Sequence, residues 1–356
     1  QQILYLGESF VGSCDPAQSP CIVDTGTPSL VVPQEVYSFI AQAYKEGSEM
    51  GTLKFQLRGA AGTPPVTVEF DVATLLENQW LMAGKEGVIL GLPLWASYYT
   101  VFDIAGQAID FHAKKSQAPP TPPPSLNAVI PLNAAPWGNG TRLTIGVRPA
   151  SAPQNVATQQ LLLDTGSSTL AFCNPTIANS SGARQLPYMS CNMYNPGGDA
   201  TGYWGYFYEG SLEVEAEGNL ALNGSKYSIM QQDMRMPCKD GLQGIFGIAF
   251  EQLDLAFADV GPLDWEADSV QGSKCPMPTS AVRLGSPLLH TLKGHGPMEK
   301  VGISWSGQVG QGQGHLYLDS TAESNPDRDA ASLVGKAKLL ELGFYNIDIQ
   351  QILYLG

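Results

Sequence analysis

Short apolar runs alternate with polar turns along most of the chain, and this pattern predicts a mostly β protein. The turns are rich in Gly, Pro and Asn, which interrupt strands and favour tight bends. Strands are predicted at 66–70, 99–103, 143–147, 161–163 and 315–318. We therefore expect an all-β fold with a few short helices.

One segment has helical spacing instead. Between Pro33 and Gly47, apolar residues recur at intervals that place them on one face of a helix. Proline is favoured in the first turn of a helix, and glycine commonly ends one. We predict a helix here, and weaker helices at 251–258 and 286–292.

Length and composition indicate a globular protein with two domains. The chain has 356 residues, of which 43% are hydrophobic, enough for two cores of ordinary size. Its net charge of −14 disfavours nucleic acid or an anionic membrane as a partner. Because neither a membrane-spanning apolar stretch nor an N-terminal signal pattern is present, we expect a mature soluble form.

Cysteines and glycosylation sequons indicate an oxidising compartment. No cysteines have Cys-x-x-Cys spacing, so three disulfides are expected, with buried free thiols as the alternative. The six cysteines are Cys14, Cys21, Cys173, Cys191, Cys238 and Cys275. Sequons begin at Asn139, Asn179 and Asn223. Together these features favour a secreted or a vacuolar or lysosomal protein.

Two sequence features concern the order of the chain. The proline-rich segment 118–125 predicts an extended connector, and a ligand for a proline-recognition domain is the alternative. In addition, the heptapeptide 1–7 recurs letter for letter at 350–356, which chance does not explain.

The tripeptide Asp-Thr-Gly occurs twice, at 24–26 and 164–166. Each copy follows an apolar run and precedes a hydroxyl residue, so the repeat includes the preceding strand and the following turn. Two such loops can bring two carboxylates together. The pattern resembles the pepsin-like aspartic proteases.

The resemblance covers nearly the whole chain, but in permuted order. Residues 1–115 look like most of the family's C-terminal lobe, and 127–330 look like its N-terminal lobe with the Asp-Thr-Gly-Ser-Ser motif. Residues 331–356 resemble the opening strands of the C-terminal lobe, and 116–126 would be the linker. This implies a bilobal, pepsin-like, circularly permuted fold.

The duplicated heptapeptide then has three explanations. The chain is a natural permutant with a competing strand, an engineered permutant, or one period of a tandem array cut with overlapping ends. Only one copy is expected to occupy the family's position in the sheet, with the other displaced.

The resemblance implies that Asp24 and Asp164 form a catalytic dyad. Carboxylates about 3 Å apart cannot both ionise, so such a pair holds one proton and can act as both acid and base. The segments 89–91 and 245–247 would thread behind the two loops. No cofactor is implied, and the spacing of the four histidines does not indicate a metal site. The residues implied to support the dyad are Thr25, Gly26, Thr27, Thr165, Gly166 and Ser167.

The family also has a flap hairpin whose tyrosine faces the substrate. The candidate flap is 206–211, with Tyr208 favoured and Tyr206 on the same strand face. A tryptophan that often supports the flap is replaced by Ala171, and Trp204 is a candidate substitute.

The resemblance further implies disulfides between Cys14 and Cys21 and between Cys173 and Cys191. Cys238 and Cys275 then remain to pair by exclusion.

We therefore expect a monomeric aspartic endopeptidase that is active at acidic pH and cleaves peptides bound in an extended conformation. Pepstatin-type compounds would inhibit it. The alternatives are a non-proteolytic inhibitor or binding protein on the same scaffold, and a zymogen-like form silenced by the duplicated strand.

Overall fold

The mostly β architecture is confirmed in the computed structural model, which describes twenty-three strands and three helices. The residues that the structure describes are 3–6, 14, 21–84, 87–114, 129–137, 140–150, 157–175, 177, 182–194, 201–216, 220–234, 238, 241–249, 255–258, 282–283, 299–307, 313–319, 322, 332–340, 345 and 347–355.

The chain forms two compact units. The first comprises Gln1–Leu143 with Met298–Gly356, and the second is Thr144–Pro297. This division differs from the boundaries expected at 127 and 330. The reason is that strands before and after the second unit in the sequence pair with one another. They also pair with strands from the early part of the first unit.

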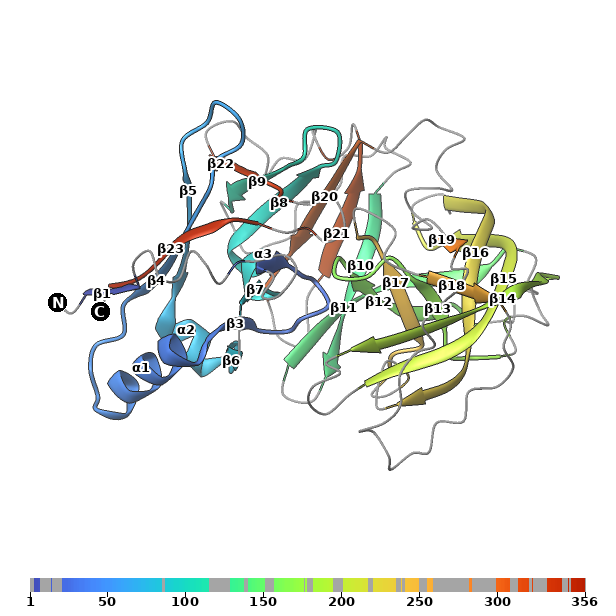
Figure 1. The fold of residues 1–356 in the computed structure, drawn as a ribbon, viewed down its shortest axis with the longest axis horizontal. Helices are drawn as coiled ribbons and strands as arrows, with labels where there is room; N and C mark the ends of the chain where they lie inside the picture. The colour runs from blue at the N-terminus through green and yellow to red at the C-terminus, as the bar shows by residue number, and fades with distance from the viewer. Residues whose placement is uncertain are drawn as a thin grey trace. The chain divides into compact units, whose positions relative to one another are not determined.

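The first unit contains three sets of paired strands (Figure 1). One sheet has the order β1 (Ile3–Leu6), β23 (Ile349–Leu355), β4 (Thr52–Leu57) and β5 (Val66–Asp71). A second has the order β2 (Cys21–Val23), β7 (Val88–Leu90), β3 (Leu30–Pro33) and β6 (Leu81–Gly84). Six more strands pair in the order β10 (Val129–Trp137), β21 (Gln313–Leu318), β20 (Lys300–Trp305), β8 (Tyr98–Asp103), β9 (Ala108–Ala113) and β22 (Leu333–Lys338).

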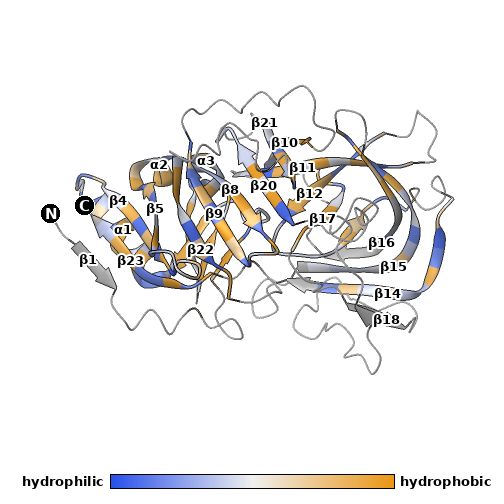
Figure 2. Cartoon of the chain, turned by 90° about the horizontal axis from the view of Figure 1, so that it is seen from above, coloured by the Kyte–Doolittle hydropathy of each residue, from blue (hydrophilic) through white to orange (hydrophobic). Residues whose placement is uncertain are grey.

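Alternating hydrophobicity places the core of the first unit. Along β4 and β5, buried and more exposed residues alternate, and the buried ones are hydrophobic. Hydrophobic residues recur along these strands and along β8 and β9 in Figure 2. The largest fully buried side chains of this unit include Trp95, Trp305, Tyr99, Phe55 and Phe102.

Six strands of the second unit close into a ring. The ring runs through β11 (Gly140–Pro149), β12 (Gln159–Asp164), β17 (Gly244–Gly247), β13 (Leu170–Phe172), β16 (Leu220–Met234) and β15 (Thr201–Val214), and β15 pairs back with β11. Beyond β15, the strands β14 (Arg184–Tyr194), β18 (Leu255–Ala258) and β19 (Val282–Arg283) extend the sheet.

The helices partly match the prediction. Helix α1 (Gln34–Lys45) follows Pro33 as expected, and Gly47 lies beyond its end with a φ of 72°. Two short helices, α2 (Val72–Glu77) and α3 (Pro93–Ser97), were not predicted. The predicted helix at 251–258 is wrong for its described part, because 255–258 pairs with β14 as strand β18. The predicted helix at 286–292 lies outside the described residues.

The two copies of the heptapeptide lie side by side in one sheet. The C-terminal copy contributes to β23, which pairs with β4, and the N-terminal copy contributes β1 at the outer edge of β23. Ile3 is opposite Leu355, and Leu6 is opposite Ile352. The C-terminal copy therefore occupies the inner position, and the other copy is displaced only to the edge.

An ion-pair cluster ties β22 to β8 and β9. Lys336 Nζ lies 3.3 Å from Asp103 Oδ2 and 3.2 Å from Asp110 Oδ1. Burial lowers the pKa of Lys336, but the neighbouring Asp110 and Asp103 carboxylates outweigh it and raise the pKa above its ordinary value of 10.5. The ammonium therefore stabilises the fold wherever it is charged in both the folded and the unfolded chain.

We predict that Lys336→Met lowers the free energy of unfolding by about 1–2 kcal/mol at neutral pH, since it removes the charge that both carboxylates contact. Because a raised pKa adds stability below the unfolded value, the wild type's advantage should shrink as the pH rises above 10.5. Urea unfolding at several pH values measures this. Lys338→Met, which changes an exposed lysine on the same strand, is the control, and an equal loss there would contradict the ion-pair role.

Candidate active site

Asp24 directly follows strand β2, at the end of a buried strand pair. β2 runs parallel to β7, and the backbone N–H of Asp24 donates to Leu90 O at 3.0 Å. The Asp24 side chain is buried, and its carboxylate accepts two hydrogen bonds. Gly26 N donates to Oδ1 at 2.8 Å, and Thr27 Oγ1 donates to Oδ2 at 2.5 Å.

Strand β12 delivers Asp164 in the same way. β12 runs parallel to β17, with Asp164 opposite Gly247. The Asp164 side chain is also buried. Gly166 N donates to Oδ1 at 2.8 Å, and Ser167 Oγ donates to Oδ2 at 2.8 Å. Each oxygen of both carboxylates therefore has a donor at the same sequence offset.

The segments 89–91 and 245–247 thread behind the two loops. β7 pairs in parallel with β2 and antiparallel with β3, so it lies between the strands before and after Asp24. β17 has the same position between β12 and β13. Main chain approaches so closely that a Cβ added at Gly91 would lie 2.1 Å from Ser29 O, and one at Gly247 would lie 2.5 Å from Ser167 O. Only glycine fits at these two positions.

The remaining support residues are buried within their own loops. Thr25 and Thr165 are fully buried, and burial is what their predicted hydrogen bonds between the loops require. Asp24 belongs to the first unit and Asp164 to the second. The meeting of the two carboxylates and the cross-bonding of the two threonines stay predictions.

The predicted flap segment is the middle of a long strand. Residues 206–211 lie within β15, where Tyr206 is opposite Met189 on β14 and Ile229 on β16. β15 and β16 remain paired as far as Val214 and Leu220, so the turn between them lies after 211. The candidate flap segment therefore lies on a strand of the hairpin formed by β15 and β16 and not at its turn, and a flap role for it stays a prediction.

Tyr206 and Tyr208 alternate with buried Phe207, which places both tyrosines on one face of the strand, as predicted. Tyr208 stacks on Tyr227, with ring centroids 6.3 Å apart, and its hydroxyl donates to Gln185 Oε1 at 3.4 Å. Burial, and to a smaller extent Tyr206, raises the pKa of Tyr208, so its hydroxyl stays protonated. A role for either tyrosine in substrate binding stays a prediction.

Sequence reasoning missed the residue that packs beside Ala171. Tyr203 is fully buried in a cluster with Ala171, Met230 and Ile245. Its hydroxyl contacts Thr169 Oγ1 at 2.7 Å and Asn192 Nδ2 at 2.7 Å. Trp204, the expected substitute, is buried elsewhere in an edge-to-face pair with Tyr206. The sequence carried no signal for Tyr203, because its contacts come from strands distant in the chain.

One disulfide prediction is confirmed and two are wrong. Cys14 pairs with Cys21 as predicted. Cys173 pairs with Cys238 and not with Cys191, which also excludes the pairing of Cys238 with Cys275. The reason is that Cys173 follows β13, whose parallel neighbour β16 precedes Cys238, while Cys191 faces Trp204 on β15. Cys191 is itself disulfide-bonded, and Cys275 lies outside the described residues.

One of the three sequon asparagines lies among the described residues. Asn223 lies in β16. Asn139 and Asn179 lie outside the described residues. Glycosylation at all three stays a prediction.

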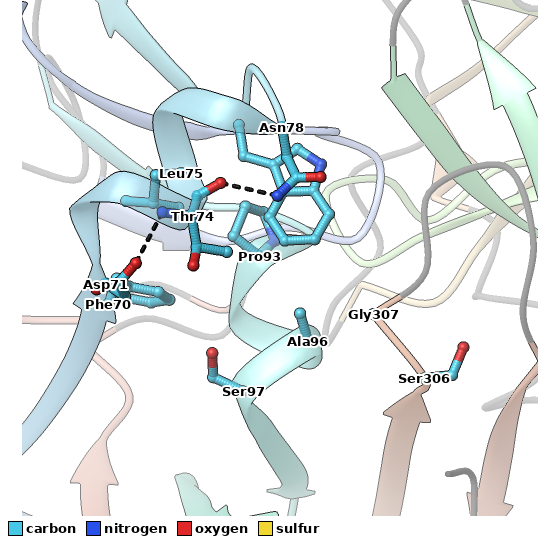
Figure 3. Close-up of a pocket in the computed structure, with 11 residues that line it drawn as sticks. Phe70, Asp71, Thr74, Leu75, Asn78, Pro93, Ala96, Ser97, Ser306 and Gly307 are labelled. Carbon is cyan, nitrogen blue, oxygen red and sulfur yellow. Dashed lines mark hydrogen bonds between the residues drawn. The ribbon is translucent and has the colours of Figure 1, made fainter. Parts of the chain in front are cut away.

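A separate pocket of about 310 Å³ lies in the first unit (Figure 3). Residues at the ends of α2 and α3 line it together with Trp80, Ser306 and Gly307. Asp71 caps α2 by accepting from Thr74 N at 2.7 Å, and Asn78 Nδ2 donates to Thr74 O at 2.8 Å. Asp71 and Asn78 therefore serve as caps of α2.

The described part of the chain contains no group of three or more His, Cys, Asp or Glu residues arranged to hold a metal ion. Among those same residues, no helix is both long and apolar enough to cross a membrane.

Comparisons with known proteins give matches among solved structures. No family model matches the chain, and no curated protein matches it. Among solved structures, the chain is similar to the aspartic proteinase from Irpex lacteus, with 18% sequence identity and a TM-score of 0.32. The match covers 53% of this chain and 47% of that protein, so the chain spans about half of its length. Activity is therefore argued from the site alone.

We predict that Gly91→Ala lowers the free energy of unfolding by about 1–3 kcal/mol or more, because the added methyl group would overlap main-chain atoms that cannot rotate away. Gly210→Ala is the control, since the nearest atom to its added Cβ is the Ala183 side chain at 3.1 Å. Thermal unfolding followed by circular dichroism compares them. Equal melting temperatures for Gly91→Ala and the wild type would contradict the close approach behind the Asp24 loop.

Proposed function

We propose that this protein is an aspartic endopeptidase in which Asp24 and Asp164 act as a pair. The observation that carries this proposal is the repeated geometry of the two loops. Each buried carboxylate accepts from the glycine N–H two residues on and from the hydroxyl three residues on. Two isolated polar turns have no reason to share this arrangement together with the same threaded strand behind them.

The proposed reaction uses one water molecule held between the two carboxyl groups. The ionised carboxylate removes a proton from water, whose oxygen attacks the peptide carbonyl carbon, while the protonated carboxyl group donates to the carbonyl oxygen. The tetrahedral intermediate then collapses. The C–N bond breaks as the leaving nitrogen takes the proton that the first carboxylate removed from water, and a hydroxyl of the intermediate returns a proton to the second carboxylate, which gives an acid and an amine.

The burial of both carboxyl groups supports the assignment of one as base and the other as acid. Both side chains are less than a tenth exposed, so a charge placed there is screened weakly and two adjacent charges would repel strongly. One proton shared by the pair removes that repulsion at acidic pH. The proposal includes the arrangement of the two loops face to face.

Substrate binding and chain order are part of the same proposal. We infer an extended peptide or protein substrate, inhibition by pepstatin-type compounds, and contact with Tyr208 or Tyr206. We also infer the permuted order, since Ile347 N donates to Cys21 O and β23 pairs with β4, which joins the last described strand to the strands around Asp24. A monomer in a secreted or vacuolar compartment fits the disulfides Cys14–Cys21 and Cys173–Cys238.

We predict that Asp24→Asn and Asp164→Asn each reduce cleavage of acid-denatured haemoglobin by at least about a thousandfold at roughly pH 3–5, because each removes one partner of the acid–base pair. Fragment release is measured with and without pepstatin. Circular dichroism verifies that both variants fold.

The matched control is Glu77→Gln, an acid-to-amide change at an exposed helix end, which should cleave like the wild type. Cleavage retained by either aspartate variant would exclude the dyad. A folded wild-type chain that shows no cleavage between pH 2 and 7 would favour the non-proteolytic alternative.

A further inference from the structure

A buried tyrosine is bonded to the base of the Asp164 loop. Tyr203 lies on β15, is fully buried, and its phenol oxygen is 2.7 Å from Thr169 Oγ1. Thr169 lies five residues after Asp164 and is itself buried. The contact thus reaches the loop from a strand that is distant in the chain.

The Tyr203 hydroxyl is hydrogen-bonded to two side chains. Asn192 Nδ2 donates to the Tyr203 oxygen at 2.7 Å, and an amide nitrogen can only donate. The Tyr203 oxygen and Thr169 Oγ1 lie 2.7 Å apart, and either hydroxyl can be the donor. The three side chains therefore form a connected chain of hydrogen bonds that ends at the Asp164 loop.

Backbone hydrogen bonds join Thr169 and Asp164 to the same neighbouring segment. Thr169 O accepts from Gly247 N at 2.7 Å, and Asp164 O accepts from the next residue, Ile248 N, at 2.8 Å. Ala249 N likewise donates to Ser167 O at 2.8 Å. Both ends of the loop are therefore fixed to the same short segment. A shift of Thr169 would move the backbone that carries the Ser167 hydroxyl.

The tyrosine ring supports the same loop through packing. Its cluster includes Ala171 and Ile245, and Ile245 pairs with Leu162 on the strand that ends at Asp164. Ala171 is small, which leaves room for the ring next to the loop. The hydroxyl and the ring therefore restrain the loop at two points.

We propose that Tyr203 is a positioning residue for Asp164, holding Thr169 so that Gly166 and Ser167 keep their donors on the carboxylate. This role rests on the proposed function, in which the Asp164 carboxyl group takes part in proton transfer. Tyr203 acts through the loop and does not itself touch substrate. Its loss should therefore lower kcat and leave KM unchanged.

The test compares Tyr203→Phe with the wild type in the cleavage assay across the acidic pH range. The substitution removes one oxygen and keeps the ring. We expect kcat to fall about tenfold and KM to stay within twofold. We also expect the acid limb of the pH–kcat profile to move to higher pH, because hydrogen bonds to a carboxylate favour its ionised form and these bonds would weaken.

Tyr227→Phe is the matched control. Tyr227 is also fully buried in the ring of strands, where its ring packs edge-to-face on Phe172 with centroids 5.4 Å apart. It should keep the wild-type pH profile. A Tyr203→Phe enzyme with wild-type kcat and profile, or a Tyr227→Phe enzyme with the same shift, would overturn the proposal.

Two further measurements keep the outcome decisive. Thr169→Val removes the hydroxyl on the other side of the bond, and its effect should not add to that of Tyr203→Phe if both act through one bond; additive effects would contradict the role. It also replaces Tyr203→Phe if that variant does not fold.

If the folded wild type does not cleave, the proposed function fails. The positioning role is then decided by the carbon-13 titration of the Asp164 carboxyl group, which should differ between the wild type and Tyr203→Phe; identical curves would refute it.

Discussion

A carboxylate removed from water must keep strong hydrogen-bond donors, and this constraint shapes both Asp-Thr-Gly loops. Asp24 and Asp164 are each buried, and each receives one backbone and one hydroxyl donor. Glycine at the third position of the tripeptide supplies the backbone donor. Because the donors occupy the same offsets in both loops, the surrounding strands hold each acid in a buried site with the same pair of donors.

This arrangement requires main-chain segments to approach each other closely. A strand must pass directly behind each loop to pair with the strands before and after the aspartate, and only glycine leaves room at Gly91 and Gly247. In the second unit, Tyr203 adds a side-chain restraint at the end of the loop. Backbone pairing therefore sets the position of the loop, and side chains refine the orientation of the acid.

The incorrect predictions fail where the pairing of distant strands decides the structure. The run at 255–258 looked helical, but its backbone pairs with β14, which lies some 60 to 70 residues earlier in the chain. Cys173 was assigned a partner by resemblance, while the parallel pairing of β13 with β16 brings Cys238 next to it. Helix α2 did carry a local signal that was missed, because Asp71 precedes a helix-forming stretch and caps it.

Local patterns were sufficient to predict the mostly β fold and helix α1, because each depends on residues close together in the chain. The Cys14–Cys21 bridge and the two candidate acids were implied by the resemblance. Three features depended on the tertiary structure: the inner position of the C-terminal heptapeptide, the partner of Cys173, and the hydrogen-bond chain from Asn192 through Tyr203 to Thr169. These features join strands that are far apart in sequence. Their formation depends on which strands become neighbours, and no local pattern of hydrophobic and polar residues encodes that choice.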